Sequence, residues 1–134
     1  MSRDGYIDSD NEWEILRWRG QVLGAIRGQR GQAFLKDLIA ALDALPTKRL
    51  IAEDLVAPGG GEFCALGAVC QARGISPWSI DPDDYDGLSV SLNIPAPLAR
   101  EVMFENDEWS ATSPEDRWQH MRSWAVHNLK RDMP

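Results

Sequence analysis

Residues Phe63–Gly74 read FCALGAVCQARG, and this stretch decides the fold. Nearly all of its positions are apolar or small, and Leu66 and Cys70 lie one helical turn apart. A helix that is apolar all round packs in the middle of a fold, because no side of it is suited to water. Gly74 follows as a C-cap, since glycine readily adopts the left-handed conformation. The stretch therefore predicts a short central helix over Phe63–Arg73.

Two longer helices are predicted on the N-terminal side of this central helix. The first carries an apolar stripe at three- and four-residue steps. Its members are Ile15, Trp18, Val22 and Ile26. Glycine destabilises a helix interior, so we expect this helix to be weak or interrupted near Gly28. The second helix carries the stripe that begins at Phe34 and ends at Leu45, and Pro46 terminates it.

Three more helices are predicted on the C-terminal side. One is capped by Asp81, begins with Pro82 and runs to about Asn93. Another covers Leu98–Glu105, and Ser113 opens the last helix of the chain. Residues 106–112, between these two helices, are predicted to form an acidic loop.

These elements predict an all-α fold, a compact single-domain bundle of five or six short helices. The segment Arg49–Val56 is ambiguous between a short strand and a helical turn, with the turn slightly favoured, so at most a minor two-stranded element is expected near residues 49–63. A chain of 134 residues is the size of one domain. We expect a flexible acidic tail over residues 1–10 and a single helical domain over residues 11–134.

Charge is distributed unevenly along the chain, whose net formal charge is −7. The segment from Ile51 to Asp116 holds thirteen carboxylates but only two basic residues, Arg73 and Arg100. The stretches Trp13–Leu50 and Arg117–Pro134 are both net positive. This polarity decides which partners can approach which surface of the protein.

The sequence contains no convincing catalytic, metal or cofactor motif. Cys64 and Cys70 point to opposite sides of one helix, and His120 and His127 lack the spacing of a metal motif, so core cysteines and surface histidines are expected. Residues 81–87 miss the calcium-loop pattern, and no phosphate-binding loop occurs. We expect no enzyme, no cofactor and no metal. One enzyme hypothesis stays open, a set of carboxylates in the Glu105–Trp109 loop.

The leading hypothesis is the binding of another protein through an acidic face with a tryptophan anchor. Tryptophan is favoured at interface hot spots, and the chain has six. Carboxylates can also occupy the positions that phosphates take in a nucleic-acid-binding groove. The candidate residues are Asp81, Asp83, Asp84, Asp86, Glu105, Asp107, Glu108 and Trp109.

An alternative hypothesis is nucleic-acid binding by an arginine face. The tripeptide Arg-Gly-Gln occurs three times, starting at residues 19, 27 and 30, and Gly20, Gly24 and Gly28 follow at four-residue steps. Such a glycine stripe lets a phosphate backbone or a partner helix approach closely, or lets another helix of this protein pack tightly, and the last explanation is favoured. The candidate nucleic-acid-binding residues are Arg17, Arg19, Arg27 and Arg30.

Residues Gly61–Cys70 resemble a G-x-[FY]-C-x-L-G-x-x-C signature of small, uncharacterised phage and prophage proteins. The segments Arg30–Leu35, Lys48–Ala52 and Phe104–Glu108 also resemble blocks of that family, and the likeness extends from about Trp18 to Leu129. The family has no activity to carry over. The resemblance implies a phage-encoded accessory protein that acts in the bacterial cytoplasm.

Together these observations predict a small acidic protein that binds and modulates or inhibits another protein, of host or phage. A nucleic-acid-binding host defence factor is one such target, in which case the chain would be anti-CRISPR-like. The first twelve residues are polar and acidic, and no apolar run is long enough to span a membrane. We therefore expect no membrane partner and a cytoplasmic location. The sequence leaves the oligomeric state open.

Overall fold

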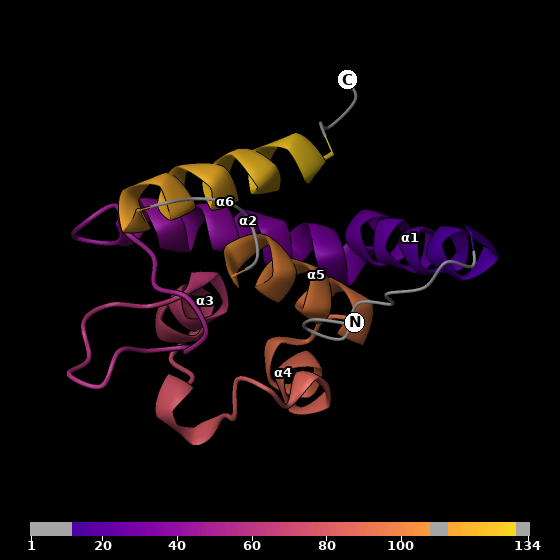
Figure 1. The fold of residues 1–134 in the computed structure, drawn as a ribbon. Helices are drawn as coiled ribbons and strands as arrows, with labels where there is room; N and C mark the ends of the chain where they lie inside the picture. The colour runs from indigo at the N-terminus through magenta and orange to yellow at the C-terminus, as the bar shows by residue number, and fades with distance from the viewer. Residues whose placement is uncertain (1–11, 108–112, 131–134) are drawn as a thin grey trace.

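The structure is a computed structural model that describes residues 12–107 and 113–130. Within these residues it contains six α-helices, one short 3-10 helix and no strand, which confirms the all-α prediction (Figure 1). The elements are α1 (Glu12–Arg27), α2 (Gln29–Ala44), α3 (Ala65–Arg73), η1 (Pro77–Ser79), α4 (Tyr85–Leu92), α5 (Ala96–Asp107) and α6 (Pro114–Asn128). The predicted acidic tail, Glu108 and Trp109 lie outside the described residues.

Helix α3 lies at the centre of the fold, as its apolar sequence predicts. It packs against α2 and α5, and every residue from Phe63 to Cys70 is buried. Gly67 is required here because a methyl group at this position would lie 1.8 Å from the carbonyl oxygen of Leu55. The helix begins two residues later than predicted, with Cys64 as its N-cap, and ends as predicted at Gly74, whose φ is 74°.

Helices α1 and α2 confirm the predicted interruption at Gly28, the single residue between them. Gly31 allows the two helices to meet closely, since a methyl group there would lie 2.0 Å from the carbonyl oxygen of Ala25. Helix α2 also packs against α6, whereas α1 packs on α2 and α5 and projects beyond the rest of the bundle (Figure 1).

The preference for a helical turn over Arg49–Val56 is wrong. This segment is irregular, and its only bridge is the antiparallel one between Val56 and Phe63, among the residues the structure describes. Apart from a bond from the Asp54 amide to the Ala52 carbonyl at 2.9 Å, most of its backbone groups bond to parts of the chain outside the segment. The amide of Ile51 donates to the carbonyl of Phe63 at 3.0 Å, and its carbonyl accepts from the side chain of Asn106 at 2.9 Å.

Two further helices have boundaries that differ from prediction. Asp81 does not cap a helix, because its carboxylate accepts from the Asp83 amide at 2.9 Å and closes a separate turn. Helix α4 begins later, at Tyr85, with Asp84 as its cap. Helix α5 begins at Ala96, before the predicted Leu98, and runs on to Asp107, so the first two residues of the predicted 106–112 loop are helical.

The last helix begins as predicted, with the Ser113 hydroxyl accepting from the Asp116 amide at 3.0 Å. Its buried side includes Trp118, Met121 and Ala125. None of the helices in the described ranges combines the length and the apolar character that crossing a membrane requires.

Candidate functional site

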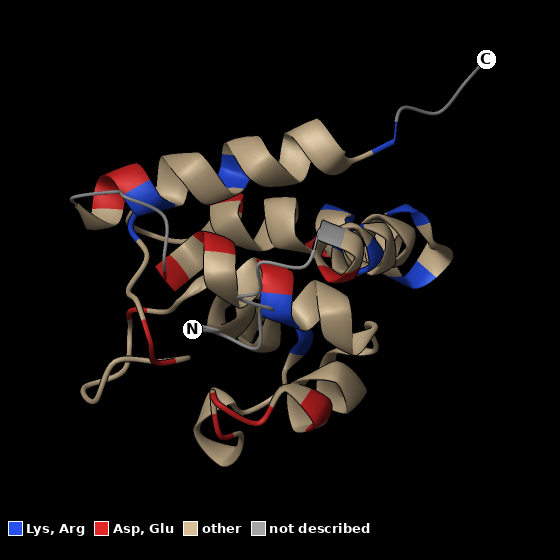
Figure 2. Cartoon of the chain, turned by 45° about the vertical axis from the view of Figure 1, so that its right-hand side comes forward, with Lys and Arg blue, Asp and Glu red and all other residues tan. Residues whose placement is uncertain are grey.

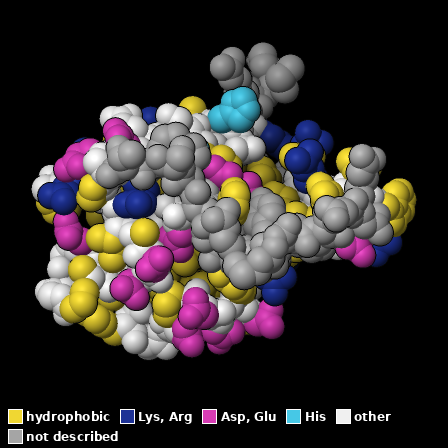
Figure 3. Space-filling view, in the orientation of Figure 1, with side chains coloured by type: hydrophobic (Ala, Val, Ile, Leu, Met, Phe, Trp, Pro, Cys, Tyr) yellow, Lys and Arg dark blue, Asp and Glu magenta, His cyan; other side chains and the backbone are white. Residues whose placement is uncertain are grey.

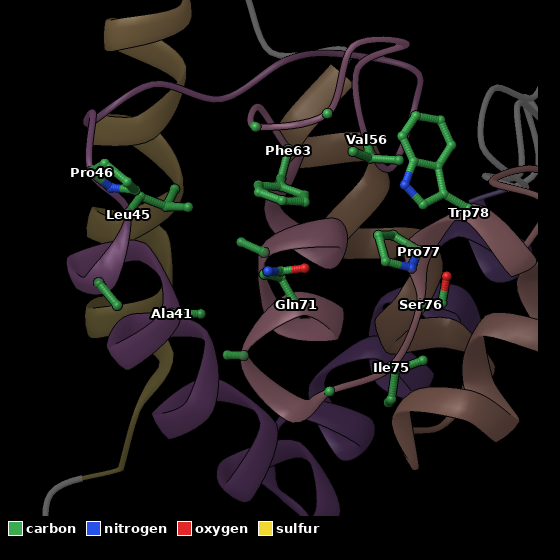
Figure 4. Close-up of a pocket in the computed structure, with 16 residues that line it drawn as sticks. Ala41, Leu45, Pro46, Val56, Phe63, Gln71, Ile75, Ser76, Pro77 and Trp78 are labelled. Atoms are coloured by element: carbon green, nitrogen blue, oxygen red, sulfur yellow. The ribbon is translucent and has the colours of Figure 1, made fainter.

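A hollow of about 750 Å³ opens beside the central helix (Figure 4). The C-terminal end of α2, the segment 56–63, helix α3 and η1 form its walls. Small residues face each other across it, because α2 presents Ala41 and Ala44 while α3 presents Ala68 and Ala72. These short side chains leave a trough that larger ones would fill. We call this hollow the Trp78 groove.

The groove is mainly apolar, and none of the described residues that line it carries a charge. Gln71 and Ser76 are the lining residues with polar side chains. Arg73, the basic residue of α3, is engaged elsewhere: one nitrogen lies 2.8 Å from a carboxylate oxygen of Asp37 and another donates to the carbonyl of Leu92 at 2.6 Å. The groove therefore offers apolar surface with little competition from hydrogen bonding.

Trp78 stands at the edge of this groove with 61% of its surface exposed (Figure 4). Its position is set by η1, where Pro77 is buried and the Ser79 hydroxyl donates to the carbonyl of Ser76 at 2.8 Å. An indole held on a short turn beside an apolar hollow loses little conformational entropy when it binds a partner. Exposed tryptophans of this kind are frequent interface anchors.

Four of the predicted acidic residues follow Trp78 directly in the chain. They form the turn before α4 and the first turn of α4, and all four are exposed. We call them the acidic turn, and its members are Asp81, Asp83, Asp84 and Asp86. Acidic residues lie along the lower edge of the molecule, where α4 lies (Figure 2), and their side chains reach the surface there (Figure 3). One end of the bundle thus combines apolar surface, an indole and negative charge.

The two other described residues of the predicted acidic face, Glu105 and Asp107, make contacts within the fold. A carboxylate oxygen of Glu105 lies 2.7 Å from Nε2 of His120, and both side chains are only 18% exposed. Asp107 accepts hydrogen bonds from the Glu53 amide at 3.0 Å and from the Asn106 side chain at 2.7 Å. These contacts join α5 to α6 and to the irregular segment. The predicted acidic face is therefore divided, and only its acidic turn is exposed throughout.

Asn106 is a structural residue that the sequence analysis missed. It is 1% exposed, and its side-chain oxygen accepts from the Ala65 amide at 3.0 Å while its nitrogen donates to the Ile51 carbonyl. A signal was present in the sequence, because Asn106 continues the helical spacing of the buried residues Val102 and Met103.

Glu101 is the most perturbed carboxyl group that the sequence analysis did not single out. Burial and, to a lesser extent, the neighbouring carboxyl group of Glu105 together raise its pKa to about 7. One of its oxygens is buried without a hydrogen-bond partner. Glu101 also lines a hollow of about 440 Å³ between α1, α5 and α6. His120 contacts Glu105, the neighbour of Glu101, and its side chain is only 18% exposed. This finding corrects the expectation that both histidines lie on the surface.

The cysteines are buried, as predicted. Burial raises the pKa of Cys64 to about 12 and that of Cys70 to about 11, so both remain protonated thiols at neutral pH. In residues 12–107 and 113–130 no three histidine, cysteine or carboxylate side chains gather as a metal site.

The four candidate arginines all lie exposed on α1 and at the start of α2 (Figure 2). The guanidinium of Arg17 lies 5.9 Å from the ring centre of Trp13. The favoured explanation of the glycine stripe is wrong for Gly20 and Gly24, because in the described structure a methyl group at either position would contact nothing within 4 Å. At these two glycines, no described residue packs against α1.

Comparison of the chain with protein-family models, curated proteins and solved structures finds no match.

Proposed function

We propose that this chain binds another protein through the Trp78 groove and the acidic turn. The observation that supports the proposal is the juxtaposition of an uncharged apolar hollow, a largely exposed indole and four exposed carboxylates. A complementary partner inserts apolar side chains into the hollow and places lysine or arginine beside the carboxylates. The apolar contacts supply affinity, and the opposite charges supply orientation and a faster association.

The target in this proposal is a host or phage protein with a basic surface. The resemblance to phage proteins supports an accessory role in the bacterial cytoplasm, in which binding modulates or inhibits the target. A nucleic-acid-binding host defence factor has a basic groove of the required kind, so an anti-CRISPR-like inhibitor is the most specific form of the proposal. Occupation of that groove by the acidic turn would exclude nucleic acid from it.

The experiment is affinity capture from nuclease-treated bacterial lysate with four forms of the tagged protein. These are the wild type, Trp78→Ala, the double variant Asp83→Asn/Asp86→Asn and, as a control, Val90→Ala. Val90 is an exposed apolar residue of α4 that does not line the groove. Asp81 and Asp84 are left unchanged because their carboxylates hold the local turn.

The wild type and Val90→Ala should recover the same partner. Loss of a hot-spot indole costs about 2 kcal/mol or more, so Trp78→Ala should weaken binding roughly 30-fold. The double aspartate variant should weaken it mainly at low salt, because charge attraction is screened as salt rises. Equal recovery of the partner by the wild type and by Trp78→Ala would contradict the proposal.

A second candidate function is nucleic-acid binding by α1 and the start of α2. The exposure of Arg17, Arg19, Arg27 and Arg30, and the open surface at Gly20 and Gly24, favour it. Binding of this type weakens steeply with salt, and each lost phosphate contact lowers the salt slope by about 1. Arg27→Glu/Arg30→Glu should then abolish binding to DNA or RNA. Binding that is indifferent to both salt and this double variant would exclude this function.

A further inference from the structure

Helix α1 carries a second apolar stripe on its outer side, which at Leu23 reaches the edge of the 440 Å³ hollow between α1, α5 and α6. Its large residues are Trp13, Leu16 and Leu23, which are 66%, 60% and 46% exposed. With Gly20 between the two leucines, they follow steps of three, four and three residues, the spacing of one helix face. The opposite stripe, which includes Trp18 and Val22, is buried against the bundle. Among the described residues, one apolar side of α1 is buried against the bundle and the other is exposed.

Positive charge surrounds this outer stripe. Arg17, Arg19 and Arg27 are exposed on α1, and hydrophobic and basic side chains lie side by side on the projecting end of the molecule (Figure 3). Gly20 adds no side chain, so another surface can approach the helix backbone closely at that point. The stripe therefore presents the chemistry that the Trp78 groove requires of a partner: apolar side chains with arginines beside them.

The two surfaces cannot meet within one molecule. Helix α1 joins the start of α2, whereas the groove lies at the end of α2 near Ala41, about 18 Å further along the helix axis. Helix α1 also points away from α3 and η1 (Figure 1). A contact between the stripe and the groove therefore requires two copies of the chain.

We infer that the outer stripe of α1 in one copy docks on the Trp78 groove of a second copy. This inference rests on the proposed function, because it uses the same groove and the same acidic turn. The stripe from Trp13 to Leu23 is about 15 Å long, so its side chains can enter the hollow together while Arg17 and Arg27 approach the acidic turn. Charge complementarity selects this pairing: two α1 helices facing each other would bring their own arginines together.

The predicted contact joins two different surfaces at opposite ends of the molecule. A contact of this kind leaves one stripe and one groove free in every dimer, so it forms open chains or rings and not a closed symmetric pair. The same contact covers the groove and thereby competes with a foreign partner. Self-association is thus a built-in limit on target binding at high protein concentration.

The test measures molar mass by sedimentation velocity across a range of protein concentrations and salt. The stripe variant is Leu16→Asp, which places a charge where the acidic turn would repel it. The groove variant is Trp78→Ala. The wild type should grow in mass with concentration and shrink with salt, and each variant alone should be monomeric. An equimolar mixture should form a one-to-one dimer and nothing larger, because it contains one intact stripe and one intact groove.

Both substituted residues are exposed, so circular dichroism should show unchanged helix content. Gly20→Phe is a second stripe variant that leaves every charge in place, and the Cβ atom it adds has no described neighbour within 4 Å. It should also be monomeric alone, because the ring blocks close approach to the helix backbone. A monomeric wild type at all concentrations overturns the inference, as does a variant that associates like the wild type or a mixture that stays monomeric. If the wild type is monomeric while Trp78→Ala still loses the foreign partner, the self-docking fails and the proposed function stands.

Discussion

The two ends of α3 differ in what covers them. At the N-terminal end the Ala65 amide is paired with the buried Asn106 side chain, and Gly67 touches the backbone of Leu55. Toward the C-terminal end the same helix lines the open Trp78 groove with Ala72 and Gln71. The difference separates structure from function on one helix, because the closed end holds the fold together and the open end remains available to a partner.

The largest loss of stability is expected when the hydrogen bonds that cover the N-terminal end of α3 are removed. Asn106→Ala removes the hydrogen-bond partners of the buried Ala65 amide and of the partly buried Ile51 carbonyl. Each unsatisfied buried group costs about 1–3 kcal/mol, so the free energy of unfolding should fall by about 3 kcal/mol. Urea titration followed by circular dichroism measures this change. A loss below about 1 kcal/mol would show that water reaches these groups.

The next comparison concerns Gly67 and Gly24, because replacing each by alanine should change the free energy of unfolding in opposite directions. Gly67→Ala forces the α3 and Leu55 backbones apart and should cost about 2–3 kcal/mol. Gly24→Ala adds a methyl group to open space on α1 and should stabilise the helix by up to about 1 kcal/mol. Thermal unfolding of both variants tests the pair, and two changes of the same sign would contradict the assigned packing.

The raised pKa of Glu101, a residue of α5 that does not line the groove, predicts that the stability of the fold depends on pH. Its pKa is raised from 4.5 to about 7 in the folded state, so the folded protein binds this proton more tightly than the unfolded chain. The stability contributed by the protonated group is complete below about pH 4.5 and is lost as the pH rises toward 7. Glu101→Gln should therefore stabilise the protein at pH 8 and flatten the decline. The control, Glu14→Gln on an exposed residue of α1, should keep the wild-type profile.

The smallest effect on stability is expected at the open end of α3. Trp78 is largely exposed, so Trp78→Ala should change the free energy of unfolding by about 0.5 kcal/mol or less while it removes partner binding. The combination of an intact fold with lost binding distinguishes an anchor from a core residue. A loss of stability similar to that of Asn106→Ala would place the indole in the core instead.

The sequence predicts the parts of the fold that depend on local patterns. The apolar run of α3, the interruption at Gly28 and the cap at Ser113 all follow from residues close together in the chain. The irregular segment 49–56 could not be predicted in this way, because its backbone partners come from Phe63 and from Asn106. Local preference is weak there, and tertiary hydrogen bonds decide the conformation.

The candidate site shows the same limit. Charge counting identifies the acidic turn, but it cannot show that Glu105 is paired with His120 or that Asp107 braces the Glu53 amide. Trp78 was one of six tryptophans, and its exposure beside an apolar hollow became visible only with α2 and α3 placed together. A groove formed by segments distant in sequence has no signature of its own in the chain.

The most direct test of the central claim places a photo-crosslinking amino acid at position 78 and, in a second protein, at position 126 on α6. Both positions are exposed, but only position 78 lines the groove. Illumination in a bacterial host should join position 78 to one protein partner and leave position 126 without that product. The same product from both positions, or from position 126 alone, would contradict binding through the Trp78 groove.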